Sequence, residues 1–192
     1  MIDWVKRCPN PMLEESDIDI RPIYTMEDFA ESDPTGEVRS HEERMEQQIA
    51  MQAATVAPYL FFGGRCEEAL AFYEQAVNAK TIMKMRFNES PAPVPEGMLQ
   101  TGFENKIMHA SFTIGTMTLM ASDGCDDKSK FDGFRLALSL PSNDVCEKCF
   151  HALADGGKID MPLTKTFWSP LYGILTDKFG VGWMVMVAQK QS

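Results

Sequence analysis

The sequence predicts an α+β fold in which two βαβββ modules follow one another after an N-terminal extension. Residues 56–190 show the order strand, helix and three further strands twice. When the first repeat is aligned with the second at one fixed sequence separation, similar residues fall on one another. Residues 1–55 carry 13 acidic and 5 basic side chains, whereas the rest of the chain carries 15 and 13. A boundary between extension and core domain is therefore expected near residue 55.

The acidic N-terminal extension is expected to hold one strand and one helix. Residues 18–24 alternate apolar and polar side chains around a proline, which is typical of a short edge strand. The charged segment 36–55 predicts a helix whose apolar stripe is limited to Val38, Met45 and Ile49. Because so short a helix is marginal alone, we expect it to pack against the core domain or a partner subunit.

The first module begins with an apolar strand over residues 58–62, which Gly63 and Gly64 end. Apolar side chains that recur on one face predict a helix over residues 65–77. Strands are expected over residues 81–87, 107–114 and 117–121. The segment 88–105 contains three prolines and two glycines, so we interpret it as a loop and a candidate lid.

The second module repeats this order. Residues 134–140 predict a strand, and residues 143–155 predict a helix that starts at Ser142 or Asn143 and ends at a glycine pair. The remaining strands are expected over residues 159–168, 172–176 and 182–187. One and the same offset places Leu60 on Leu138, Phe72 on Phe150, Ala76 on Ala154 and Lys80 on Lys158.

Charge and cysteine content limit the class of function. A net charge of −10 argues against a nucleic-acid partner, which requires a basic face. With no run of about 18 apolar residues and no apolar signal segment, we expect a cytoplasmic protein with no membrane partner. Its five cysteines should then stay reduced. For Cys146 and Cys149 we favour helix packing over zinc or redox chemistry, because only His151 lies nearby.

Five segments of the core domain carry a family resemblance. They are residues 58–64 (PYLFFGG), 68–73 (EALAFY), 107–110 (IMHA), 166–168 (TFW) and 176–184 (TDKFGVGWM). Together they resemble the PhnB-like group of the vicinal oxygen chelate superfamily, which includes glyoxalases, bleomycin-resistance proteins and extradiol dioxygenases. The resemblance implies a cupped mixed sheet and a homodimer. A domain name used for the group implies demethylubiquinone methyl transfer, but the chain shows no Gly-rich strand-to-helix loop for S-adenosylmethionine.

The extension carries a second resemblance. Residues 4–9 (WVKRCP) and 18–24 (IDIRPIY), followed by Glu27, Asp28 and Phe29, are similar to the C-terminal end of YCII-related domains. Only the end of such a domain is present. We therefore carry over no activity from it.

The superfamily's enzymes hold a divalent metal with His, Gln or Glu from the first and last strands of each module, as the resemblance implies. Such donors suit a Lewis-acidic cation. In this chain the corresponding strands contain no His, Asp, Glu or Gln, over residues 58–62, 117–121, 134–140 and 183–187. We therefore expect no metal and no other cofactor.

Three residues are candidates for binding a ligand in the cup, under the 88–105 loop. An imidazole can act as a ligand contact or as a general base, so His109 either serves a ligand in one of these ways or supports a neighbouring loop. Arg135 lies in an apolar strand and pairs either with an internal carboxylate or with an anionic ligand. Trp168 either forms an apolar wall or belongs to the core. No residue is assigned a catalytic role.

Two functions follow from these residues and the resemblance. The favoured one is a PhnB-like homodimer without metal that binds a small apolar or anionic molecule. The alternative is an enzyme of the superfamily that acts on a small organic substrate, with His109 as the base.

Overall fold

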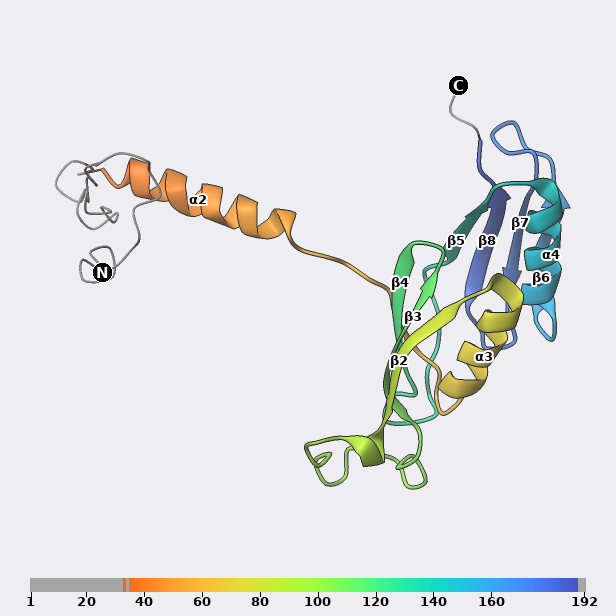
Figure 1. The fold of residues 1–192 in the computed structure, drawn as a ribbon, viewed down its shortest axis with the longest axis horizontal. Helices are drawn as coiled ribbons and strands as arrows, with labels where there is room; N and C mark the ends of the chain where they lie inside the picture. The colour runs from red at the N-terminus through yellow and green to blue at the C-terminus, as the bar shows by residue number, and fades with distance from the viewer. Residues whose placement is uncertain (1–32, 34, 190–192) are drawn as a thin grey trace, which may run out of the picture. The chain divides into compact units, whose positions relative to one another are not determined.

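The computed structural model describes residue 33 and residues 35–189, and the chain divides into two units at residue 55 (Figure 1). Within the described residues, the first unit contains helix α2, Glu37–Gln52, which confirms the predicted helix apart from its last turn. No helix in the described ranges is both long and apolar enough to cross a membrane. The strand expected over residues 18–24 lies outside the described residues.

The start of α2 is capped from outside the helix. The carboxylate of Asp33 accepts hydrogen bonds from the backbone N–H groups of Val38 and Arg39, at 3.3 and 3.0 Å. These bonds satisfy two of the donors that a helix leaves free at its N-terminus. They also hold the pKa of Asp33 below its usual value. The side chains of the predicted apolar stripe are all exposed, and their packing against a partner stays a prediction.

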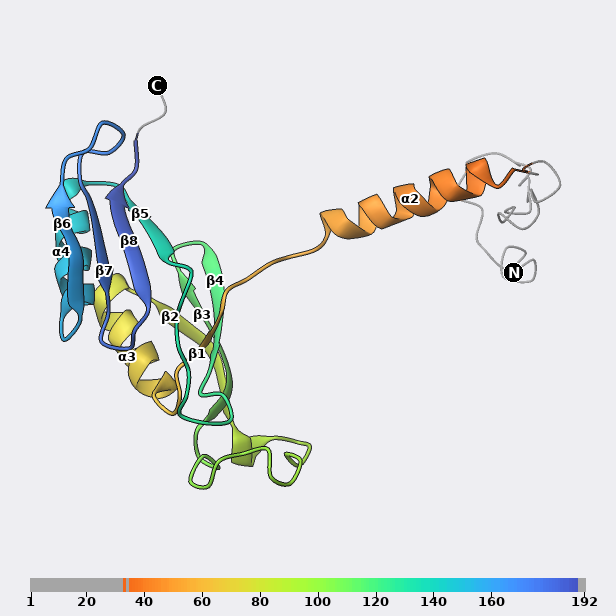
Figure 2. The ribbon, with the colours of Figure 1, turned by 180° about the vertical axis from the view of Figure 1, so that it is seen from behind.

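The second unit contains two four-stranded mixed sheets, which confirms the predicted tandem modules (Figures 1 and 2). Sheet 1 has the order β1 (Tyr59–Phe61), β4 (Met117–Ser122), β3 (Ile107–Ile114) and β2 (Lys80–Arg86). Sheet 2 has the matching order β5 (Leu136–Leu140), β8 (Gly182–Val187), β7 (Tyr172–Thr176) and β6 (Lys158–Thr164). In each sheet the first strand runs parallel to its neighbour, and the other pairs are antiparallel.

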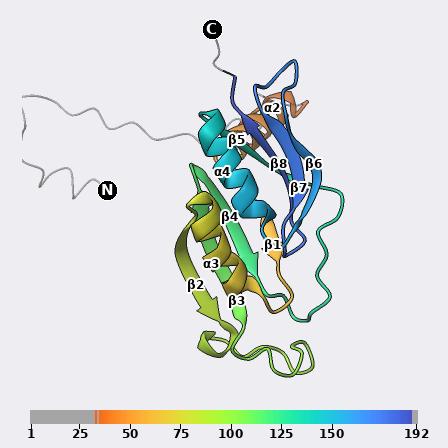
Figure 3. The same cartoon turned by 90° about the vertical axis from the view of Figure 1, so that its right-hand side faces the viewer.

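One helix follows the first strand of each module: α3, Cys66–Val77, and α4, Asn143–Ala154. Helix α3 ends at Asn78, which adopts the left-handed conformation with φ 54°. Helix α4 begins after Ser142, whose Oγ accepts a hydrogen bond from the backbone N–H of Val145 at 3.4 Å. The two helices pack against one another, and Figure 3 shows them side by side.

A single core joins the two modules. The ring of Tyr73 on α3 stacks on Phe112 of β3, with centroids 6.2 Å apart, and meets Trp183 of β8 edge-on at 5.6 Å. All three side chains are buried. Each sheet therefore turns one face toward this shared core. We call the opposite face of each sheet, which points away from the core, its open face.

Asp177 connects the modules through hydrogen bonds. Its carboxylate is 3% exposed and lies in the turn between β7 and β8. Its Oδ2 accepts hydrogen bonds from the Tyr73 hydroxyl at 2.7 Å and from Trp183 Nε1 at 2.8 Å. Its Oδ1 accepts from the backbone N–H groups of Phe179 and Val181, at 2.9 and 3.0 Å. The turn motif thus ties helix α3 of module 1 to sheet 2.

Two differences between predicted and observed boundaries change the position of a candidate site residue. The strand expected over residues 159–168 ends at Thr164, because a turn follows in which the backbone N–H of Ser169 donates to Thr166 Oγ1 at 2.9 Å. As a result Trp168 lies in a loop rather than on a strand. Arg135 lies one residue before β5 instead of within it.

Candidate functional site

The side chain of Arg135 lies across the open face of sheet 2. Its Nη1 donates to the backbone oxygen of Leu175 on β7 at 3.1 Å, and its Nη2 donates to Oδ2 of Asp160 on β6 at 3.2 Å. Because β8 lies between β5 and β7, the side chain must cross β8 to reach both acceptors. The sequence left open whether Arg135 pairs with an internal carboxylate, and the structure shows that it pairs with Asp160. The Arg135 side chain is still 36% exposed, so part of it remains accessible to a ligand.

Gly182 makes room for this crossing. A Cβ atom at this position would lie 2.9 Å from Cγ and 3.0 Å from Nη1 of Arg135. These distances are shorter than non-bonded carbon and nitrogen atoms tolerate. A glycine at the start of β8 therefore allows the arginine to lie flat on the sheet.

Asp160 is shared by two cations. Its Oδ1 lies 3.0 Å from Lys158 Nζ, and its Oδ2 accepts hydrogen bonds from both Arg135 and Thr176 Oγ1, the latter at 3.0 Å. The hydrogen bond from Lys158, followed by that from Thr176, holds the pKa of Asp160 below its usual value. Two cations and one carboxylate leave this cluster with a positive charge.

An open hollow of about 560 Å³ lies beside Arg135. Phe131, Phe134 and Met184 contribute apolar wall, Asp132 contributes a carboxylate, and Gly180 contributes backbone. The rings of Phe131 and Phe134 meet edge-on at 6.3 Å. Apolar walls combined with one cationic group are typical of sites for small molecules that carry an anionic group.

His109 lies on the open face of the other sheet. Strand β3 places it two residues from Ser111, which lies opposite Met120, and Met120 lies opposite Tyr59. His109 and Tyr59 therefore share one face. The Tyr59 hydroxyl oxygen and His109 Nδ1 are 3.0 Å apart, within hydrogen-bond distance. Tyr59 belongs to one of the family segments, residues 58–64, but no local pattern indicates its contact with His109, because a pairing across an intervening strand depends on the register of the sheet.

The three predicted ligand-binding residues do not meet in one hollow of a single chain. His109 belongs to sheet 1. The ring of Trp168 packs edge-on against Tyr172 at the start of β7, with centroids 4.6 Å apart. Arg135 is bonded to the other end of the same strand. Their shared role in ligand binding stays a prediction.

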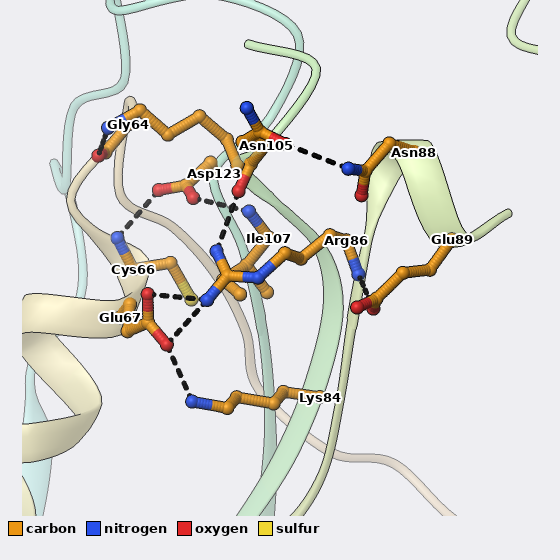
Figure 4. A network of polar contacts seen from close by, with 11 residues as sticks. Gly64, Cys66, Glu67, Lys84, Arg86, Asn88, Glu89, Asn105, Ile107 and Asp123 are labelled. Atoms are coloured by element: carbon orange, nitrogen blue, oxygen red, sulfur yellow. Dashed lines mark hydrogen bonds and ion pairs between the residues drawn. The ribbon is translucent and has the colours of Figure 1, made fainter.

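The 88–105 loop is fixed at both ends by a polar network (Figure 4). Nη2 of Arg86 donates to both carboxylate oxygens of Glu67 at 2.8 Å, and its Nη1 donates to the backbone oxygen of Asn105 at 2.6 Å. Asn88 Nδ2 donates to Asn105 Oδ1 at 2.8 Å. Between these anchors the loop projects beyond the end of sheet 1 (Figures 1 and 2). Its role as a lid stays a prediction.

Among residue 33 and residues 35–189, no three His, Cys, Asp or Glu side chains lie close enough together to hold a metal ion. The site residues His109 and Arg135 lie on different sheets, and neither is joined by two further metal-binding groups. The described part of the chain therefore offers no set of side chains that could coordinate a metal ion.

Comparison with known proteins identifies the family. A family model described as 3-demethylubiquinone-9 3-methyltransferase matches residues 54–186. The chain belongs to this family. It is 35% identical to protein YjdN of Escherichia coli over 144 residues, which span 71% of this chain and 97% of YjdN. Residues 1–53 lie outside the family match, so the resemblance of the extension to a YCII-related domain stays a prediction.

Solved structures support the PhnB-like assignment. Protein PA1353 of Pseudomonas aeruginosa is 36% identical with a TM-score of 0.63, covering 72% of this chain and all of PA1353. A Bacillus cereus protein described as a putative 3-demethylubiquinone-9 3-methyltransferase, PhnB protein, is 27% identical with a TM-score of 0.59, covering 70% of this chain and all of that one. The PhnB-like resemblance is thereby confirmed.

A more distant solved structure confirms the predicted fold. The fosfomycin resistance protein FosX of Listeria monocytogenes is 13% identical, with a TM-score of 0.51 over 71% of this PhnB-like chain and 93% of FosX. At this identity the likeness concerns the arrangement of strands and helices alone. The chain thus has the vicinal oxygen chelate fold.

Proposed function

We propose that this PhnB-like protein binds a small molecule with an anionic group and an apolar body, in a cup that two copies of the chain form together. The observation that carries this proposal is the hollow beside Arg135, in which a partly exposed guanidinium adjoins apolar side chains. An anion there gains charge-assisted hydrogen bonds from Arg135. No metal or other cofactor is part of the proposal.

The second copy is proposed because large apolar side chains are exposed on the open face of sheet 1 and beside sheet 2. On sheet 1, Tyr59 and Phe61 are 38% and 48% exposed, and Met83 lies opposite Ser111 on the same face. Near sheet 2, Phe134 is also exposed. Pairing sheet 1 of one copy with sheet 2 of another covers such surfaces and brings His109 of one copy toward Arg135 of the other.

Sedimentation at several protein concentrations tests the dimer. We expect a dimer, and we expect deletion of residues 1–50 to weaken association or lower solubility. A monomer at all concentrations would contradict the proposed cup. An unchanged dimer with an unchanged melting temperature after the deletion would show that the extension does not contribute to assembly.

Calorimetric titration with benzoate tests ligand binding, with benzylamine as the cationic counterpart. We expect benzoate to bind and benzylamine not to bind. Arg135→Met should abolish benzoate binding, whereas Lys148→Met on the exposed side of α4 changes the net charge equally and should leave binding intact. Unchanged affinity in Arg135→Met would refute the site.

A second variant separates binding from folding. Asp160 competes with a ligand for Arg135, so Asp160→Asn should strengthen benzoate binding several-fold. If Arg135→Met unfolds the protein and Asp160→Asn does not strengthen binding, Arg135 serves only as a structural ion pair.

We also propose a cytoplasmic location. Within the described residues, Cys66, Cys125, Cys146 and Cys149 are free thiols, which suits a reducing compartment.

A further inference from the structure

We infer that Tyr59 fixes the tautomer of neutral His109, with the ring proton on Nε2, so that His109 meets a ligand as a hydrogen-bond donor. This inference rests on the proposed function in one respect, since it names the role of a second residue in the same cup. The contact between Tyr59 and His109 lies within one chain and does not depend on a ligand.

The two side chains are held together across a sheet. Tyr59 lies on β1 and His109 on β3, with β4 between them. Besides the 3.0 Å distance between the hydroxyl oxygen and Nδ1, the two rings lie 5.7 Å apart at 34°. Phe61 also packs against Tyr59, with ring centroids 5.0 Å apart. The phenol is therefore supported in the position from which it reaches the imidazole.

The direction of the hydrogen bond follows from the chemistry of the two groups. A neutral imidazole has one N–H and one nitrogen lone pair, whereas a phenol is a good donor and a weak acceptor. The O–H of Tyr59 therefore donates to the lone pair of Nδ1. The Ser122 hydroxyl, which also lies near Tyr59, has two other partners: its oxygen accepts from the backbone N–H of Gly124 at 2.8 Å, and its O–H donates to the backbone oxygen of Ile107 at 3.3 Å.

This arrangement fixes what a ligand encounters. With the Nδ1 lone pair bonded to Tyr59, the proton of neutral His109 resides on Nε2, and no lone pair of the ring remains free. A group without a free lone pair does not accept a proton from a substrate. His109 therefore acts as a donor toward an oxygen of the ligand, whereas a role as general base requires Tyr59 to release it first.

The inference agrees with the chemistry of the other open face. Arg135 also presents only donors. In a cup that combines the two faces, both polar groups select for a ligand with acceptor oxygens, such as a carboxylate or phosphonate. A cationic ligand finds no acceptor at either residue.

The protonation of His109 can be measured without a ligand. In ¹⁵N-labelled protein at about pH 8, long-range proton–nitrogen spectra separate a nitrogen that carries a proton from one that carries a lone pair. His109→Gln identifies the His109 signals among the three histidines of the chain. We expect the Nε2–H form in the native protein, a mixture of both forms in Tyr59→Phe, and no change in Met117→Leu at the exposed start of β4. A mixture or the Nδ1–H form in the native protein would overturn the inference.

The donor role is separated from a base role by two substitutions of His109. Glutamine retains an N–H donor but accepts no proton at neutral pH, and leucine retains neither property. We expect His109→Gln to bind benzoate within about threefold of the native affinity, and His109→Leu to lose about tenfold or more. Equal losses in both variants would refute the donor role.

Failure of the proposed function gives a different result. If benzoate does not bind the native protein, the proposed anion site fails, whereas the spectra still decide whether Tyr59 fixes the proton of His109. If benzoate binds and depends on Arg135 but not on His109, the anion site stands and the donor role fails.

Discussion

Removal of the Tyr73 hydroxyl is expected to destabilise the core domain, because this hydroxyl connects module 1 to the buried carboxylate of Asp177. The hydrogen bond measures 2.7 Å, and Tyr73 is fully buried, so no water replaces the lost donor. Burial raises the pKa of Tyr73 well above its usual value, so the hydroxyl stays protonated at any ordinary pH. The change proposed is Tyr73→Phe.

The magnitude follows from the partners of Asp177. A hydrogen bond to a charged acceptor contributes about 1.5–3 kcal/mol. Oδ2 of Asp177 keeps its bond from Trp183 Nε1, and Oδ1 keeps both backbone donors, so the carboxylate is not left unpaired. The cost is thus one charge-assisted bond, without the further penalty of an orphaned buried charge. We expect the free energy of unfolding to fall by about 2 kcal/mol.

Urea unfolding followed by fluorescence measures this loss as a lower midpoint with an unchanged slope. Tyr172→Phe is the matched control. Tyr172 is also buried, but its hydroxyl makes no side-chain hydrogen bond within the described ranges, and we expect it to cost less than about 0.5 kcal/mol. A similar loss in both variants, or a loss below about 0.5 kcal/mol in Tyr73→Phe, would refute the role assigned to Asp177.

Three further predictions concern charge, geometry and metal content. Hydrogen bonds from Lys84 and Arg86 lower the pKa of Glu67 to about 2. Their stabilisation is therefore present above the unfolded value of about 4.5 and is lost as the pH falls toward 2. In Glu67→Gln, the free energy of unfolding measured by urea should fall less toward acid pH than in the native protein. The difference should stay below about 1 kcal/mol, because Glu67 is half exposed. The same acid dependence in both proteins would contradict the assignment. Gly182→Ala should displace Arg135 from the sheet and weaken benzoate binding several-fold by calorimetry, and unchanged affinity would show that the flat position of the arginine is not needed. Dialysed protein should contain well below one zinc, nickel, manganese or iron ion per chain by elemental analysis. A near-unit content that His109→Ala removes would contradict the expected absence of a metal.

The order of elements could be predicted because it depends on local patterns. Strands β2 and β6 start at Lys80 and Lys158, in agreement with the offset that superposed the two copies, and helices α3 and α4 start at Cys66 and Asn143, within one residue of it. Apolar periodicity and glycine pairs are properties of neighbouring residues, so they are visible in the chain before it folds. Boundaries were less certain where a local turn competes with the strand, as at Ser169.

The polar contacts of the site depended on tertiary structure. The sequence alone established that Arg135 needs either an internal carboxylate or an anion, but it did not identify Asp160, which lies on another strand 25 residues away. No local pattern showed that Tyr73 binds Asp177, which lies 104 residues later in the chain.

The sequence by itself determined the modules, the family and the types of residue available to a site. Only the tertiary structure decided which of these residues meet. Tyr59 and His109 are 50 residues apart and become partners because β4 lies between their strands in one register. A shift of one residue would turn one of them into the core. Strand register and sheet order arise from long-range pairing, which no local pattern specifies.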